Sequence, residues 1–177
     1  MINKRPVLLA LCAVLLCACA KEPAVSTPTQ PENLSITDAA TTEKHIEGFA
    51  LTVGDVRLIP GAMTDVEAAL GTAADHYEAP SCVHDGNDIV YVYDFGEIMT
   101  SPGDGGSYIA SVTVLPDAEI ATEEGLTIGA SVEEMLALYG ACEEEFGRYV
   151  YTRGETTLTF LTTDGAVTGF SYAYIGE

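Results

Sequence analysis

The stretch Tyr91-Val92-Tyr93-Asp94-Phe95-Gly96-Glu97 occurs a second time in this chain, in slightly altered form. Fifty-eight residues later the sequence reads Tyr149-Val150-Tyr151-Thr152-Arg153-Gly154-Glu155, and five of the seven positions are identical. The same offset relates the apolar residues that follow, Ile109, Val112 and Val114, to Val167, Phe170 and Tyr172. Self-similarity at a long, fixed period is typical of one structural unit built twice. We therefore expect two tandem copies, residues 46–117 and residues 118–177.

Each copy is expected to contain one short helix with marked ends. Thr64-Asp65-Val66-Glu67 and Ser131-Val132-Glu133-Glu134 both match the capping box, in which a hydroxyl and a carboxylate satisfy free backbone N–H groups at the helix start. Gly71 and Gly140 follow the apolar residues and suit the left-handed position that ends a helix. Helices this short are not stable alone, so each must pack against a sheet.

Strand-like runs surround both helices. Residues 49–53 and 56–59 predict a hairpin before the first helix. Three runs separated by turn residues follow each helix, at 89–94, 97–100, 108–115, and then at 148–151, 156–161, 167–174. This order predicts the α+β class, with two tandem copies of a short helix packed on an antiparallel sheet. Because the two helix starts are 67 residues apart, copy one must carry a net insertion of nine residues within Thr72–Ile89.

Residues 1–18 are typical of a lipoprotein signal peptide. A positively charged start precedes an apolar run at residues 7–16, which is too short to span a bilayer comfortably. Leu16-Cys17-Ala18-Cys19 resembles the lipobox of bacterial lipoproteins, which implies cleavage after Ala18 and a diacylglycerol thioether on Cys19. An ordinary secretory signal is the alternative. Residues 19–45 are then a lipidated N-terminus and a disordered linker, because they hold few large apolar residues.

The charge of the chain excludes one class of partner. The sequence has 27 acidic and 7 basic residues, and 27 and 5 remain after residues 1–18 are removed, a formal charge of −22. Such a surface repels phosphate backbones, so we expect no nucleic-acid partner. The acidic excess either keeps the protein soluble or attracts a basic partner, and an alternative function is the binding of a small ligand or a divalent cation.

Two groups of side chains are candidates for specific contacts. Six tyrosines occupy alternate positions of strand-like runs, where neighbours share one sheet face: Tyr91, Tyr93, Tyr149, Tyr151, Tyr172 and Tyr174. They are either half-buried packing or a recognition face, since tyrosine suits both. Once Cys19 is acylated, Cys82 and Cys142 remain, and an even pair outside the cytoplasm suggests a disulfide. The alternative is that Cys82 is a buried free thiol and Cys142 is incidental.

No catalytic or metal site is predicted. His76, Cys82 and His84 lie near one another in the insertion, but they lack zinc-ligand spacing, and no orienting group for a nucleophile is recognisable. Calcium loops, phosphate-binding glycine loops and nucleophilic serine motifs do not occur in the sequence. We therefore expect no enzyme activity, no cofactor and no metal.

The order of these motifs resembles a known architecture. A Gly-x-x-[Ser/Thr]-x-x-Glu pattern, a short apolar helix, Leu/Tyr-Gly and Tyr-x-Tyr strands are similar to the tandem-repeat fold of the beta-lactamase inhibitory protein and of small outer-membrane-assembly lipoproteins. Residues 78–88, Tyr91-Val92-Tyr93 and residues 122–129 more closely resemble uncharacterised lipoproteins of Gram-positive bacteria. The resemblance covers about residues 49–175. It implies a non-catalytic protein-interaction module, anchored by lipid on the extracytoplasmic face of the cell membrane, with an envelope or extracellular protein as partner.

Overall fold

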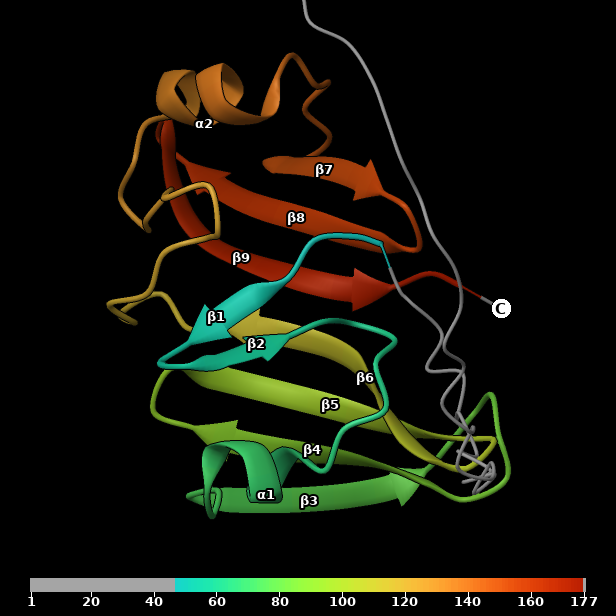
Figure 1. The fold of residues 1–177 in the computed structure, drawn as a ribbon. Coiled ribbons are helices and arrows are strands. Elements are labelled where there is room, and N and C mark those ends of the chain that lie inside the picture. Colours follow the sequence, from blue (N-terminus) through green and yellow to red (C-terminus); the bar gives the residue numbers. More distant parts are fainter. Residues whose placement is uncertain (1–46, 177) are drawn as a thin grey trace, which may run out of the picture. The chain divides into compact units, whose positions relative to one another are not determined.

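A seven-stranded antiparallel sheet is the main feature of the computed structural model, in which residues 47–176 are described (Figure 1). Its strands are β3 (Asp75–Pro80), β4 (Asn87–Tyr93), β5 (Gly96–Gly103), β6 (Gly106–Val114), β7 (Arg148–Arg153), β8 (Thr156–Thr163) and β9 (Ala166–Tyr174). The strand order is β3-β4-β5-β6-β9-β8-β7, so two meanders meet where β6 pairs with β9.

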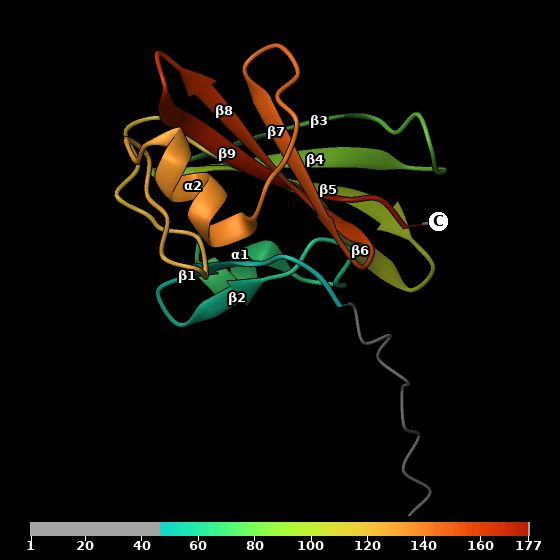
Figure 2. The same cartoon turned by 90° about the horizontal axis from the view of Figure 1, so that it is seen from above.

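One face of this sheet is covered. Figure 2 shows the hairpin of β1 (Leu51–Val53) and β2 (Val56–Leu58), together with α1 (Val66–Leu70) and α2 (Val132–Tyr139), on the same side of the sheet. The core lies between the two layers, and its largest fully buried side chains include Leu51, Met135, Phe160 and Tyr172. None of the helices and strands within residues 47–176 covers the opposite face, which we call the open face.

The predicted α+β class, with two tandem copies of a short helix packed on an antiparallel sheet, is wrong. Strand and bridge residues make up 51% of the described chain and helical residues 10%, so the protein is mostly β, with one continuous sheet and only two short helices. Two features account for the error. The helix α1 has only five residues, and the insertion Thr72–Ile89 contains β3, a strand that the sequence analysis did not predict. All six residues of β3 are exposed at the sheet edge, so they lack the alternation by which strands are recognised.

The other predicted strands are confirmed. The hairpin at residues 49–59 forms as β1 and β2, and the six predicted runs correspond to β4–β9 with limits that differ by up to three residues. The capping box at Ser131 is also confirmed, because Glu134 N–H donates to Ser131 Oγ and Ser131 N–H donates to Glu134 Oε2. The first helix starts one residue later than expected, since Asp65 Oδ1 accepts from Ala68 N–H at 3.0 Å.

The two helices are attached to the sheet in the same way. Tyr93 of β4 donates its hydroxyl proton to the carbonyl oxygen of Gly71 at 3.0 Å, directly after α1. Tyr151 of β7 donates to the carbonyl oxygen of Gly140 at 2.9 Å, directly after α2. Each tyrosine thus satisfies one of the carbonyl groups that the end of a helix leaves without a partner. The repeated sequence stretch therefore carries the link between helix and sheet in both halves.

The segments before the helices are also bound to the sheet in matching positions. Gly61 N–H donates to Ile109 O at 2.7 Å, and Ile109 N–H donates to Ala62 O at 3.0 Å. In the other half, Gly129 N–H donates to Val167 O and Val167 N–H donates to Ala130 O, both at 2.8 Å. Both helices are consequently held at each end by contacts with the half of the sheet that follows them.

We predict that Tyr93→Phe and Tyr151→Phe each lower the free energy of unfolding by about 1 kcal/mol, the net value of one hydrogen bond. The double variant should show about the sum, since the two bonds share no partner. Urea denaturation measures the effect. Tyr77→Phe on β3, where the side chain is 53% exposed, is the control and should change little. A double variant as stable as the control would show that these bonds do not hold the helices.

Candidate interaction surface

Small and hydroxyl-bearing side chains lie at the centre of the open face. In the strand register, Thr113 lies opposite Ser171, which in turn lies opposite Thr159, and Thr157 lies opposite Ala173. Their sequence neighbours Val112, Leu158 and Tyr172 are buried on the other side. We call this surface the central patch, and it consists of Ser111, Thr113, Thr157, Thr159, Ser171 and Ala173.

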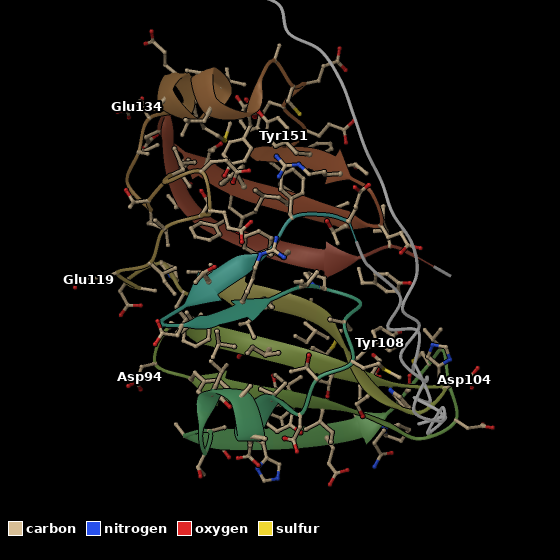
Figure 3. All side chains as sticks on the ribbon, in the orientation of Figure 1. Asp94, Asp104, Tyr108, Glu119, Glu134 and Tyr151 are labelled. Atoms are coloured by element: carbon tan, nitrogen blue, oxygen red, sulfur yellow. The ribbon has the colours of Figure 1, made fainter. Side chains whose placement is uncertain are left out.

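The central patch carries no charge in a strongly acidic domain. Residues 47–176 contain 22 Asp and Glu residues but only three Arg residues, two of which form ion pairs, Arg57 with Glu123 and Arg153 with Glu124. Many acidic side chains lie at the margins of the fold, as Figure 3 shows for Asp94, Asp104, Glu119 and Glu134. The cores of protein interfaces are depleted of charged residues, so an uncharged patch within such a surface is the best candidate contact site.

The six tyrosines predicted as an interaction face lie mostly on the covered side. Tyr149 and Tyr172 are buried, and Tyr91, Tyr93 and Tyr151 pack partly buried against the core. Burial raises the pKa of Tyr91, Tyr93, Tyr151 and Tyr172. Tyr174 contacts Tyr108 edge to face, with ring centroids 5.5 Å apart. The alternation in the sequence identified residues that share a face, but it contained no signal to tell the covered face from the open one.

Cys82 and Cys142 are free thiols in this structure, but Cys82 is exposed and not buried as the second alternative had it. Cys82 is exposed between β3 and β4, whereas Cys142 lies between α2 and β7, where its thiol contacts Val150 O at 3.5 Å. Five strand spacings separate β4 from β7 along the sheet, about 24 Å. A disulfide requires Cα atoms within about 7 Å, so the fold keeps these thiols apart.

Each of the two histidines of the insertion contacts a tyrosine ring. His84 Nε2 lies 3.4 Å from the hydroxyl of Tyr108, and their rings meet edge to face. His76 lies on the exposed edge strand β3, with its ring 6.4 Å from that of Tyr91. Within residues 47–176, no three His, Cys, Asp or Glu side chains are placed to hold a metal ion.

A polar cluster on the covered side links three elements. The hydroxyl of Tyr139, at the end of α2, lies 2.7 Å from both Thr122 Oγ1 and Glu124 Oε2. Arg153, at the end of β7, donates to Glu124 Oε1 at 3.0 Å. Burial alone would raise the pKa of Glu124, but the hydrogen bonds from Tyr139 and Arg153 outweigh it and hold the pKa below its ordinary value. These groups satisfy one another, so the cluster supports the fold and leaves little capacity for a ligand.

A shallow hollow of about 370 Å³ lies between α2 and residues 125–130. Its lining is mainly apolar and includes Leu126 and Leu138. The carboxylate of Glu134 also lines it, but Ser131 N and Oγ both bind one of its oxygens at 2.8 Å, and these bonds lower the Glu134 pKa. The hollow therefore offers few polar groups that would orient a small molecule.

The sequence analysis missed three exposed apolar side chains, which lie on β7, on β8 and in the turn before β7. Val150 on β7 and Leu161 on β8 are each 47% exposed, and Phe146, just before β7, is fully exposed. Glu143, Glu144 and Glu145 precede Phe146, and as a run of like charges they indicate only a solvated segment. A bulky aromatic residue followed by glycine, between that run and a strand, was the available signal.

Comparisons with known proteins add no assignment. No family model matches the chain, and no curated protein or solved structure shows significant similarity to it. Among the described residues, neither helix has the length and apolar character that would be needed to cross a membrane. The predicted lipid attachment site, Cys19, lies outside the described residues.

One buried polar atom provides a stability test. The hydroxyl of Tyr172 is buried and has no hydrogen-bond partner, whereas the hydroxyl of Tyr139 is bonded. We predict that Tyr172→Phe leaves the free energy of unfolding unchanged or raises it by about 1 kcal/mol, because it removes an unsatisfied group. Tyr139→Phe should lower it by at least about 1 kcal/mol. Urea denaturation distinguishes the two, and a clear loss of stability in Tyr172→Phe would reveal a bound water or another partner.

Proposed function

We propose that this protein is a membrane-anchored extracytoplasmic lipoprotein that acts as a non-catalytic protein-interaction module at the cell envelope. The observation that carries the proposal is the uncovered, uncharged central patch on a domain with 22 acidic residues and three arginines. A solvated face without function would be expected to share the acidic character of the rest of the surface. A partner protein that covers the open face would bury the central patch and leave the charged margins in water.

The position of the partner follows from the proposed anchor. The lipobox-like Leu16-Cys17-Ala18-Cys19 would tether the chain to the outer leaflet, and the Pro-rich residues after it would hold the domain away from the lipid. The acidic domain would itself be repelled by anionic lipid headgroups. An envelope or extracellular protein is therefore a better partner for the open face than the membrane surface.

The anchor is tested by mass spectrometry of the mature N-terminus. We expect a peptide that begins at Cys19 and carries two acyl chains on a thioether-linked glycerol. Cys19→Ser should release the protein from the membrane fraction, and Cys17→Ser is the matched control that should leave it bound. An unmodified mature N-terminus at another residue would contradict the lipoprotein assignment.

The open face is tested by placing charge on it. We expect the mature protein to recover a reproducible partner from envelope extract after cross-linking, and Thr159→Glu with Ser171→Glu to abolish the recovery. Ala137→Glu on the exposed side of α2 adds the same kind of charge on the covered side of the molecule and should have no effect. Urea midpoints confirm that each variant is folded. Equal recovery by all variants, or turnover of a substrate by the purified protein, would count against the proposal.

The alternative, binding of a small ligand or a divalent cation, is tested by calorimetric titration with Ca²⁺. The acidic surface predicts only weak, diffuse binding that added salt suppresses. Stoichiometric binding that persists in salt would favour the alternative.

A further inference from the structure

Phe146 is the most exposed large apolar residue in the described part of the chain. Its relative exposure is 101%, and it lies in the turn that leads from α2 into β7. Single apolar residues on a surface are common and need no explanation. The backbone at this position, however, is also unfavourable for phenylalanine, so neither packing nor local conformation accounts for the residue.

The unfavourable backbone is a left-handed one. Phe146 has φ of +54° and the following Gly147 has φ of +75°. A two-residue turn with both central residues at positive φ normally carries Asn-Gly, because bulky side chains clash with the backbone there. Residues held in such conformations cluster at functional sites, since the surrounding structure must enforce them.

The turn is held firmly enough to enforce this conformation. Glu145 N–H donates to Arg148 O at 2.9 Å, and Arg148 N–H donates back to Glu145 O at 3.1 Å. Gly147 N–H donates to Glu144 Oε1 at 3.0 Å. Thr162 of β8 donates to Gly147 O from its N–H at 2.8 Å and from its hydroxyl at 3.2 Å. The phenyl ring is therefore presented on a rigid turn, and little backbone freedom remains to be lost on binding.

The surroundings of the turn indicate the chemistry of a partner. Arg148, two residues along the chain, lies opposite Leu161 in the strand register, and Val150 follows on the same side of β7. The turn thus adjoins the β7–β8 corner of the open face, where the apolar Val150 and Leu161 are exposed beside the guanidinium of Arg148. On the other side Glu143, Glu144 and Glu145 directly precede Phe146 in the chain, and the Glu144 carboxylate accepts from Gly147 N–H. An exposed aromatic residue flanked by acids complements an apolar pocket bordered by Lys or Arg.

We propose that Phe146 is the anchor residue of the interaction surface, and that it inserts into an apolar pocket with a basic rim on the partner protein. This inference rests on the proposed function, because it assigns the β7–β8 corner of the open face as the centre of the contact. Phenylalanine at this position destabilises the turn, and its contact with the partner protein is the reason for its presence. The carboxylates beside it favour basic partners over acidic ones.

Two synthetic peptides of equal charge serve as probes of this chemistry. One alternates Lys with Leu in amphipathic order and the other replaces every Leu with Ser. The full mature chain in detergent should bind the Lys-Leu peptide at least tenfold more tightly in calorimetric titration. Phe146→Asn should abolish this preference without weakening the Lys-Ser peptide, and Glu143→Gln with Glu145→Gln should weaken both peptides. Val83→Asn removes another exposed apolar side chain, 78% exposed between β3 and β4, and should leave the preference intact.

Stability provides the second measurement. Phe146→Asn should leave the urea midpoint unchanged or raise it, because asparagine suits the turn better than phenylalanine. A lower midpoint would show that Phe146 supports the fold, and an unchanged peptide preference would show that it is not the anchor; either result overturns the inference. Recovery of the envelope partner separates the two proposals. If Thr159→Glu with Ser171→Glu abolishes recovery of the envelope partner and Phe146→Asn does not, only the proposal that Phe146 is the anchor residue is overturned.

Discussion

The pairing of residues 111–114 with residues 170–173 makes one seven-stranded sheet out of two meanders, and the rest of the structure depends on it. Val112 and Val114 on one side, and Phe170 and Tyr172 on the other, are buried on the covered face along this short seam. Next to it each strand contains an extra residue, Ala110 in β6 and Thr168 in β9. Such bulges bend a strand away from its neighbour. In both halves, the residue just before the bulge binds the segment that leads into a helix, so the seam also fixes the layer above the sheet.

The helices α1 and α2 and the β1–β2 hairpin cover only one side of the sheet, and the open face lies on the other. An antiparallel sheet can have one solvated face. Residues along each strand then alternate between apolar side chains in the core and polar side chains in water. Here that face is unusual for this chain, because most of the acids lie in turns, helices and the outer strands, although Glu97 on β5 lies opposite Thr113 at the border of the central patch. Charge at the margins keeps the protein soluble and repels like-charged surfaces. The uncharged hydroxyl-bearing centre can be desolvated at lower cost than a carboxylate, which is the property that a contact surface needs.

The repeated stretch shows which features the sequence could predict. Its tyrosines mark strands, and Gly96 and Gly154 mark points where a backbone carbonyl, of Thr113 or Glu47, occupies the space of a side chain. These are local rules, and the strands, the hairpin and the second capping box followed from them. The class was mistaken because β3 is an edge strand whose exposed residues show no periodicity, and because a five-residue helix was given too much weight. The orientation of the tyrosines also could not be predicted, since it depends on which face the helices cover.

Phe146 illustrates the remaining limit of sequence reasoning. The sequence does not show whether a residue suits its local backbone or is held there against its own conformational preference. In the sequence, Glu143 to Gly147 is an acidic run that ends in a turn, and nothing shows that the aromatic residue is solvated. The structure adds the positive φ, the five hydrogen bonds that enforce it, and the full exposure of the ring. Each of these features is ordinary alone. Together they place an exposed aromatic side chain at a position where neither its backbone conformation nor its packing stabilises the fold. The rest of the chain is locally consistent, with matched contacts at both helices. The one conflict lies at the β7–β8 corner of the open face, where a partner would benefit from it.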